Sequence, residues 1–565
     1  MVATQLRATR MRHRLCASLF ERNVIEAAKF RFRKKQVRGW RIMSLLVVFA
    51  TCLNCFAQSE PSSDFRTPEP LPQPHLNGPT IYGARPGHAV LYRIPCTGTR
   101  PIRFAASPLP HSLHLDRKAG ILYGDTPVAH RDYAMVLSAS NAFGSDRRKM
   151  KIVVGDQVGL TPQMGWNDWY TFYGHVSEAD VRAAAAAMIG SGMADFGYQY
   201  VDIDDAWAGK PDPVTESSAP VRDPQGDLMP NSRFPDMQGL TRYIHGLGLK
   251  AGIYSSPGPL TCARYEGSWR HEDRDARQFA SWGFDLLKYD WCSYRKIATD
   301  MSLEELQKPY RKMAESLARV DRDIVLNICQ YGMGDVWKWG REVGGNSWRT
   351  TGDLGMERNS ALPAFYRVGL ANAALSRYAS SGGWNDPDYI LIGTVGDPMS
   401  PDVAPHPTAM THDEQYSYMS MWALMAAPLF FAGDMARLDR FTLNVLCNSE
   451  IVDIDQDSLG VQASIVRKND AELILEKPLN DGSRALGLFN LTAKPRSITV
   501  PWAELDIQGA QSLHDVWRQR NLGESDKSLS MVIAGHSVEV IKLTPHLRRR
   551  RNSGTSERRD PGKQQ

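Results

Sequence analysis

RDARQFASWGFDLLKYD, residues 274–290, begins as an amphipathic helix and ends as a short apolar strand whose last residue is Asp290. The same order of strand, polar loop and helix recurs along residues 157–460. About eight such units fit into a region of this length. The repetition predicts a (β/α)8 TIM barrel as the central domain, with strands that include Tyr200–Asp204, Lys250–Tyr254, Leu286–Asp290 and Ile324–Cys329.

Acidic side chains gather where these predicted strands end. A single aspartate at such a position is usually a helix cap or a surface residue. Barrel enzymes place their chemistry at the carboxyl ends of the strands, so several acids on one rim indicate an active site. Hydrolysis of a glycosidic bond requires two carboxyl groups flanking that bond. The acids on the predicted rim are Asp204, Asp205, Asp290, Asp353, Asp386 and Asp388.

Short alternating apolar runs flank the barrel region on both sides. Residues 77–156 show the pattern of a small Ig-like β-sandwich, without residues that suggest chemistry. Residues 461–545 predict a second, antiparallel β-sandwich domain. Residues 58–76 are rich in proline and predict a linker. The expected fold is therefore a TIM barrel between two β domains.

The positive charge of the chain is concentrated at its ends. The net charge of the whole chain is +5, whereas residues 1–57 carry +10 and residues 546–565 carry +5, which leaves −10 for the body between them. An acidic body argues against nucleic acid as a partner. The tail, 546–565, predicts a basic disordered segment.

Residues 1–57 predict a leader or signal peptide. A basic region precedes the apolar run Met43–Phe56, which is too short for a stable membrane span, and cleavage is expected after Ala57. The segment before the apolar run is long for a signal, so translation starts downstream of Met1 or the leader is atypical. We expect export to the periplasm or the medium. The remaining five cysteines show no zinc-binding spacing, and we expect no metal and no cofactor.

Six motifs on the predicted rim resemble glycoside hydrolase family 27, which contains α-galactosidases and α-N-acetylgalactosaminidases. They are Met164-Gly165-Trp166-Asn167, Ile203-Asp204-Asp205-Ala206-Trp207, Gly252-Ile253-Tyr254, Leu287-Lys288-Tyr289-Asp290-Trp291-Cys292, Ser347-Trp348-Arg349-Thr350-Thr351-Gly352-Asp353 and Gly383-Trp384-Asn385-Asp386-Pro387-Asp388. The resemblance covers about residues 160–460 and implies a retaining, exo-acting hydrolase of terminal α-galactosyl residues on oligo- or polysaccharides. Related enzymes often dimerise, so a homodimer is a further expectation.

The resemblance also implies a role for each matching position. Asp290 is expected to be the nucleophile and Asp353 the general acid/base. Lys288 should keep Asp290 ionised, and partial burial beside a negative neighbour should keep Asp353 protonated. The expected substrate-binding residues are Trp166, Asp204, Asp205, Tyr254, Lys288, Gln330, Arg349 and Asp386.

Departures from the family pattern leave the specificity open. Cys262 and Cys292 match a family disulfide between two active-site loops, whereas Ala206 stands where another family bridge has cysteine. Gln330 replaces a glutamate that reaches the sugar's 2-hydroxyl in many α-galactosidases, and Tyr331 argues against N-acetyl preference. The alternatives are a β-L-arabinopyranosidase or another galactose-like specificity, a non-catalytic carbohydrate-binding protein, and a metal-dependent barrel hydrolase, which would need clustered histidines.

Overall fold

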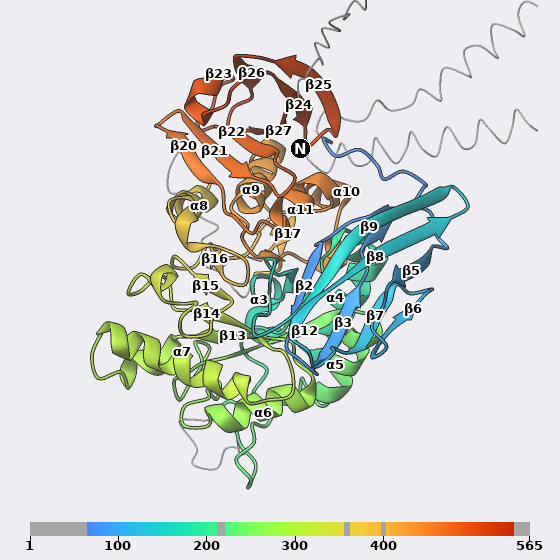
Figure 1. Ribbon diagram of the computed structural model, residues 1–565. Helices are drawn as coiled ribbons and strands as arrows, with labels where there is room; N and C mark the ends of the chain where they lie inside the picture. Colours follow the sequence, from blue (N-terminus) through green and yellow to red (C-terminus); the bar gives the residue numbers. More distant parts are fainter. Residues whose placement is uncertain (1–64, 212–220, 355–361, 397–402, 547–565) are drawn as a thin grey trace, which may run out of the picture. The chain divides into compact units, whose positions relative to one another are not determined.

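The computed structural model describes residues 65–211, 221–354, 362–396 and 403–546. The predicted leader, 1–57, and all of the predicted tail except His546 lie outside the described residues. A sheet of eight parallel strands forms the centre of the chain and confirms the predicted TIM barrel (Figure 1). The strands, in chain order, are β10 (Met164–Asn167), β11 (Tyr200–Asp202), β12 (Lys250–Ser255), β13 (Leu286–Asp290), β14 (Val325–Cys329), β15 (Ser347–Arg349), β16 (Trp384–Asp386) and β19 (Leu429–Phe431).

The barrel closes between its seventh and eighth strands. Neighbouring strands pair in chain order from β10 to β16, and β19 pairs with β10. Ile390, just beyond β16, donates its backbone N–H to the carbonyl of Phe430 at 2.7 Å and forms a parallel bridge with Phe431. The ring therefore brings the carboxyl ends of all eight strands to one rim, which is where barrel enzymes carry their sites.

Helices follow the strands as the sequence pattern predicts. Ser177 and Asp180 form a capping box at the start of α4, and three acidic residues occupy the first turn of α6. Gly283 ends α6 in a left-handed conformation, with φ of 97°, before β13 begins. The longer helices are α4 (Glu178–Gly190), α5 (Met237–Gly246), α6 (Glu272–Trp282), α7 (Leu303–Ala318), α8 (Phe365–Ala373) and α9 (His412–Leu424).

Strand β13 shows how local alternation directs side chains to the site. Tyr289 is fully buried, and its ring contacts Tyr310 of α7 at 6.1 Å between centroids, so it points to the helix layer. Successive strand residues point to opposite faces. Lys288 and Asp290 therefore point to the inside of the barrel, and Asp290 does so at the rim.

The C-terminal domain confirms the predicted antiparallel β structure. Six strands lie in the order β20 (Ser464–Lys468), β21 (Glu472–Pro478), β22 (Arg484–Asn490), β27 (Val538–Pro545), β24 (Gln511–Asp515) and β25 (Arg520–Ser525). A second sheet pairs β23 (Arg496–Pro501) with β26 (Ser528–Ile533). Helix α9 of the barrel contacts this domain, where Ser420 Oγ accepts a hydrogen bond from Trp517 Nε1 at 2.8 Å.

The N-terminal module is built from two main sheets and the short pair of β1 (His75–Leu76) and β4 (Cys96–Thr97), around a core of its own. Its larger sheet has the order β2 (Ile81–Ala84), β9 (Gly144–Val154), β8 (Arg131–Asn141) and β5 (Arg103–Ser107), with β8 and β9 as a long antiparallel pair (Figure 1). The smaller sheet has the order β3 (Ala89–Arg93), β7 (Ile121–Asp125) and β6 (Leu113–Asp116). Two layers around one core fit a β-sandwich, whereas β2 and β9 run parallel. The Ig-like assignment stays a prediction.

Part of the predicted Pro-rich linker is bound to the folded body. Arg66 is 9% exposed, and its guanidinium donates to the carbonyl of Val538 at 2.8 Å. Its backbone N–H also donates to the hydroxyl of Tyr416 at 2.9 Å. The sequence predicts a linker here, and proline-rich composition says nothing about a single anchoring arginine. Arg66 therefore fixes the start of the described part of this segment to the folded body, whereas residues 68–73 are exposed.

Candidate active site

Asp290 accepts one hydrogen bond on each of its carboxylate oxygens. The hydroxyl of Tyr254, at the end of β12, lies 3.0 Å from Oδ2, and the hydroxyl of Tyr331, after β14, lies 2.6 Å from Oδ1. Strands β12 and β14 are the two neighbours of β13 in the barrel. Each side chain thus reaches Asp290 because the closed ring places three successive strand ends side by side.

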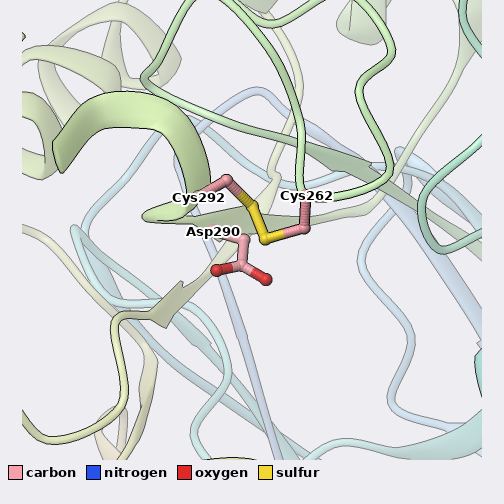
Figure 2. A group of neighbouring side chains, drawn as sticks. All are labelled: Cys262, Asp290 and Cys292. Atoms are coloured by element: carbon pink, nitrogen blue, oxygen red, sulfur yellow. A yellow bond between two sulfur atoms is a disulfide. The ribbon is translucent and has the colours of Figure 1, made fainter. Parts of the chain in front are cut away.

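The predicted disulfide between Cys262 and Cys292 is present, with its Cα atoms 4.8 Å apart. It lies directly over Asp290 (Figure 2), since both sulfurs and a carboxylate oxygen fall within 4.8 Å of one another. Tyr254 Oη is 3.1 Å from the sulfur of Cys292, and Tyr331 Oη is 3.6 Å from that of Cys262. Each tyrosine hydroxyl therefore touches one oxygen of Asp290 and one sulfur. Because the sulfurs are bonded to each other, the trio offers no thiolate to a metal ion.

Burial dominates the ionisation of Asp290. The side chain is almost completely covered, and burial raises its pKa above the ordinary range of aspartate. The positive charge of Lys288 and the hydrogen bond from Tyr331 oppose this rise, whereas Asp353 adds to it. The prediction that Lys288 favours the ionised nucleophile has the right direction, but burial outweighs that effect.

Lys288 forms its ion pair with Asp204. Its Nζ lies 2.8 Å from Asp204 Oδ2, which also accepts hydrogen bonds from Asn167 Nδ2 and the hydroxyl of Tyr389, both at 2.9 Å. Burial opposes the ionised form of Asp204, yet the charge of Lys288 and these donors hold its pKa below the ordinary value. Asp204 is thus held as an ionised hydrogen-bond acceptor inside the barrel rim.

Asp205 belongs to a different environment from its neighbour. Its Oδ1 accepts the backbone N–H of Ala206 at 2.6 Å, and its Oδ2 accepts that of Ala263 at 2.7 Å. Burial raises its pKa to about 6 although these hydrogen bonds oppose the rise. Ala263 follows Cys262, so Asp205 also ties the disulfide loop to the end of β11.

Arg349 joins two carboxyl groups on the opposite part of the rim. Its Nη2 lies 3.1 Å from Asp353 Oδ1 and 3.1 Å from Asp388 Oδ2, and only 3% of its side chain is exposed. The side chain of Asp353 is 66% exposed among the described residues. The expectation of a half-buried Asp353 beside a negative neighbour therefore differs from the observed contact, which is with a cation.

Three of the predicted substrate-binding residues are held by the protein itself. Trp166 is completely buried and donates its indole N–H to the carbonyl of Gly433 at 2.9 Å. Gln330 donates its amide to the carbonyl of Met333 at 2.7 Å, and its buried Oε1 has no hydrogen-bond partner among the described residues. Asp386 accepts from Asn327 Nδ2 and from the backbone of Asp388, both at 2.8 Å. For Asp386 the contacts fit an orienting role.

Residues outside the predicted set complete the site. Tyr331 and Tyr389 each follow a residue that was singled out in the sequence, namely Gln330 and Asp388. Asp168, directly after the first motif, accepts the backbone N–H of Asp204 at 2.6 Å. Burial, and then the charge of Asp204, raise the pKa of Asp168 well above its ordinary value. No local pattern reveals these residues, because their partners lie on other strands.

Part of the backbone strain among the described residues lies at this rim. Four non-glycine residues here adopt the left-handed conformation that side chains usually avoid, and each follows or lies between site residues. They are Ala206 (φ 80°), Cys292 (φ 36°), Tyr331 (φ 65°) and Asp388 (φ 94°).

Two family models match the chain. Residues 161–457 match alpha galactosidase A, and residues 472–543 match the alpha galactosidase C-terminal beta sandwich domain. The chain belongs to the alpha galactosidase A family. The first match covers the barrel with its whole rim, and the second covers the β domain that follows it. Both agree with the family that the six sequence motifs resemble.

Relatives of this family cover most of the chain. A probable alpha-galactosidase of Dictyostelium discoideum is 37% identical over 397 residues, which are 69% of this chain and 94% of the relative. Alpha-galactosidase A of Cellvibrio japonicus is 34% identical over 411 residues, 69% of this chain and 93% of the relative. The protein is an α-galactosidase-type glycoside hydrolase.

Solved structures of α-galactosidases are similar in fold to this chain, and one of them covers a larger share of it than the relatives above. Alpha-galactosidase I of Mortierella vinacea has a TM-score of 0.61 at 27% identity, and the match covers 68% of this chain and 97% of that protein. A candidate alpha-galactosidase of Bacteroides fragilis has a TM-score of 0.76 at 34% identity and covers 84% of this chain and 98% of its own. The larger share shows that the latter protein also resembles part of the N-terminal module.

Proposed function

We propose that the protein removes terminal α-galactosyl residues from oligo- or polysaccharides by double displacement, with Asp290 as nucleophile and Asp353 as general acid/base. The observation that carries the proposal is the setting of Asp290: a buried carboxylate at the end of β13, gripped on both oxygens by tyrosine hydroxyls. A nucleophile must be held in one orientation to attack the anomeric carbon, and these contacts restrict its rotation.

The first step forms a covalent galactosyl-enzyme. One oxygen of Asp290 bonds to the anomeric carbon while the glycosidic C–O bond breaks, and Asp353 transfers its proton to the departing oxygen. In the second step a water molecule gives a proton to Asp353, its oxygen bonds to the same carbon, and the electron pair of the ester bond returns to Asp290. The exposed position of Asp353 leaves it accessible to the departing group in the first step and to the attacking water in the second.

The polar residues near Asp290 suit the binding of sugar hydroxyls. Lys288 and the ionised Asp204 form an ion pair inside the rim, beside Asp205. We assign these three to hydroxyl contacts, together with Arg349, and the ring of Tyr254 to the wall of the pocket, whereas Trp166 and Gln330, which are completely buried, would hold neighbouring residues in place. The alternative substrate, a β-L-arabinopyranoside, corresponds to a galactoside without the C6 hydroxymethyl group. A β-L-arabinopyranosidase of Geobacillus stearothermophilus is 23% identical, a likeness that shows the fold alone.

An aryl glycoside panel tests the proposal. We expect turnover of 4-nitrophenyl α-D-galactopyranoside and a much lower kcat/KM for the β-L-arabinopyranoside. Asp290→Asn should reduce kcat by several orders of magnitude, and Asp290→Gly with azide should yield the β-galactosyl azide, which identifies the nucleophile. Near-normal turnover by Asp290→Asn or Asp353→Asn would contradict the assignment. An arabinopyranoside preference would redirect the specificity while leaving the mechanism in place.

We also propose that the protein is exported. The disulfide at the active site supports this, because such bonds persist in oxidising compartments, and the basic and apolar pattern of residues 1–57 supports it independently. Among the described residues no helix is both long and apolar enough to cross a bilayer. Fractionation of cells that express the full chain, with the mature N-terminus determined by mass spectrometry, tests export. Light scattering of the purified protein, which measures its mass in solution, tests the predicted homodimer.

A further inference from the structure

The two hydrogen bonds on Asp290 differ in where they come from. Tyr254 lies on strand β12, is 2% exposed, and has the ammonium of Lys288 over its ring at 5.3 Å. Tyr331 lies on the loop after β14, is only partly buried, and has a left-handed backbone with φ of 65°. Oδ2 therefore faces packed barrel, whereas Oδ1 faces the partly exposed loop.

This difference identifies the oxygen that attacks the sugar. Oδ2 is enclosed by Tyr254, whose hydroxyl also touches the sulfur of Cys292. Oδ1 is on the open side, where its neighbour is the hydroxyl of Tyr331 at 2.6 Å. A carboxylate oxygen has more than one lone pair, so Oδ1 can accept this hydrogen bond and still bond to carbon.

We propose that Tyr331 is a catalytic residue that accelerates release of the sugar from Asp290 without accelerating the step that attaches it. The inference rests on the proposed function. As Oδ1 bonds to the anomeric carbon, its negative charge is lost, and a hydrogen bond from Tyr331 weakens. As that bond breaks in the second step, charge returns to Oδ1 and the hydrogen bond strengthens. Only an interaction that is stronger in a transition state than in the preceding state accelerates the step.

The surroundings of Tyr331 fix its hydroxyl over Oδ1. Gly332 follows it with φ of 87°, and a Cβ atom there would lie 2.3 Å from the carbonyl oxygen of Thr350. The loop backbone therefore packs closely against the residue after β15, and the hydroxyl of Tyr331 also lies 3.6 Å from the sulfur of Cys262. Removal of the hydroxyl alone, as in Tyr331→Phe, keeps the ring and these backbone contacts.

Single-turnover and steady-state kinetics of Tyr331→Phe with a dinitrophenyl α-galactoside test the proposal. On the pH-independent plateau, we expect the deglycosylation rate to fall about ten-fold, the loss for one hydrogen bond to a charged group, and the glycosylation rate to stay equal or rise. Consequently kcat and KM should fall together, kcat/KM should be maintained, and a galactosyl adduct on Asp290 should accumulate in the mass spectrum.

The matched control is Tyr123→Phe, which removes a hydroxyl from a side chain that is 47% exposed in the N-terminal module and should leave both rates unchanged. Equal slowing of both steps in Tyr331→Phe, slowing of glycosylation alone, or no change in either would overturn the proposal for Tyr331. An inactive wild type on every α-galactoside would instead contradict the proposed function, so the two failures are distinguishable.

Discussion

Lys288 binds Asp204, just beyond the end of β11 and two strands away in the barrel, with 2.8 Å between Nζ and Oδ2. The Lys288 side chain is 13% exposed and that of Asp204 is 3% exposed. Burial by itself lowers the pKa of the lysine, but Asp204 and then the other nearby anionic groups raise it well above its ordinary value. Both partners therefore stay ionised, Lys288 as the ammonium and Asp204 as the carboxylate.

Replacement of Lys288 by Met should damage both stability and activity. The variant leaves Asp204 buried without its cation, which costs about 3–5 kcal/mol of unfolding free energy. It also removes the cation that opposes the raised pKa of Asp290, so the acid limb of kcat/KM should move to higher pH. Urea unfolding and pH profiles measure the two effects. Lys338→Met is the control, because that lysine is 55% exposed in its ion pair with Asp335; equal losses in both variants would refute the role of burial.

Asp205 should make the protein less stable as the pH rises. Its pKa is about 6 in the folded protein, against roughly 3.9 for an unfolded chain. Between these two values the folded state holds a proton that the unfolded state has lost, so raising the pH lowers the unfolding free energy, by on the order of 2–3 kcal/mol.

Chemical denaturation of Asp205→Asn from pH 4 to 7 measures this contribution. The slope of unfolding free energy against pH should become less negative than in the wild type, because the titrating group is gone. Asp335→Asn, at a carboxyl that is 49% exposed, serves as the control and should retain the wild-type slope. Equal slopes of unfolding free energy against pH for wild type and Asp205→Asn would show that Asp205 does not titrate between pH 4 and 7.

Reduction of the disulfide should slow the enzyme and weaken the fold. The bridge joins residues 30 positions apart, and a closed loop of this length stabilises a protein by about 3–4 kcal/mol. Both tyrosines that donate hydrogen bonds to Asp290 also contact the sulfurs of the disulfide. We therefore expect dithiothreitol to lower kcat/KM of the wild type and reoxidation to restore it. The double variant Cys262→Ala/Cys292→Ala should have low kcat/KM with or without the reductant; sensitivity of that variant would point to another thiol.

Gly165→Ala should destabilise the barrel. A Cβ atom at this position of β10 would lie 2.4 Å from the carbonyl oxygen of Tyr200 on β11, so the two strands would have to separate, at a cost of about 2–3 kcal/mol. Gly190→Ala is the control, since nothing lies within 4 Å of a Cβ there, at the end of α4, and alanine favours helix. Thermal unfolding compares them, and an unchanged midpoint for Gly165→Ala would contradict the packing argument.

Much of the fold and the positions of the rim acids follow from local sequence patterns. Alternation along Leu286–Asp290 and helical spacing before it predict one β/α unit, and repetition predicts the barrel. The pairing of Cys262 with Cys292 comes from the family resemblance, and the structure contains the bond. These features depend on residues that are close in sequence or belong to a recognisable motif.

Other features depend on which strand ends the closed ring brings together. The sequence determines that Asp290 ends a strand, that Lys288 shares its face, and that acids recur along the rim. Only the tertiary structure decides that Lys288 binds Asp204, that Tyr331 donates to Asp290, and that Arg66 is buried in the body. Strand periodicity is a local property of the chain, whereas a side chain's hydrogen-bond partner is whichever group the ring and the packed loops place within about 3 Å of it.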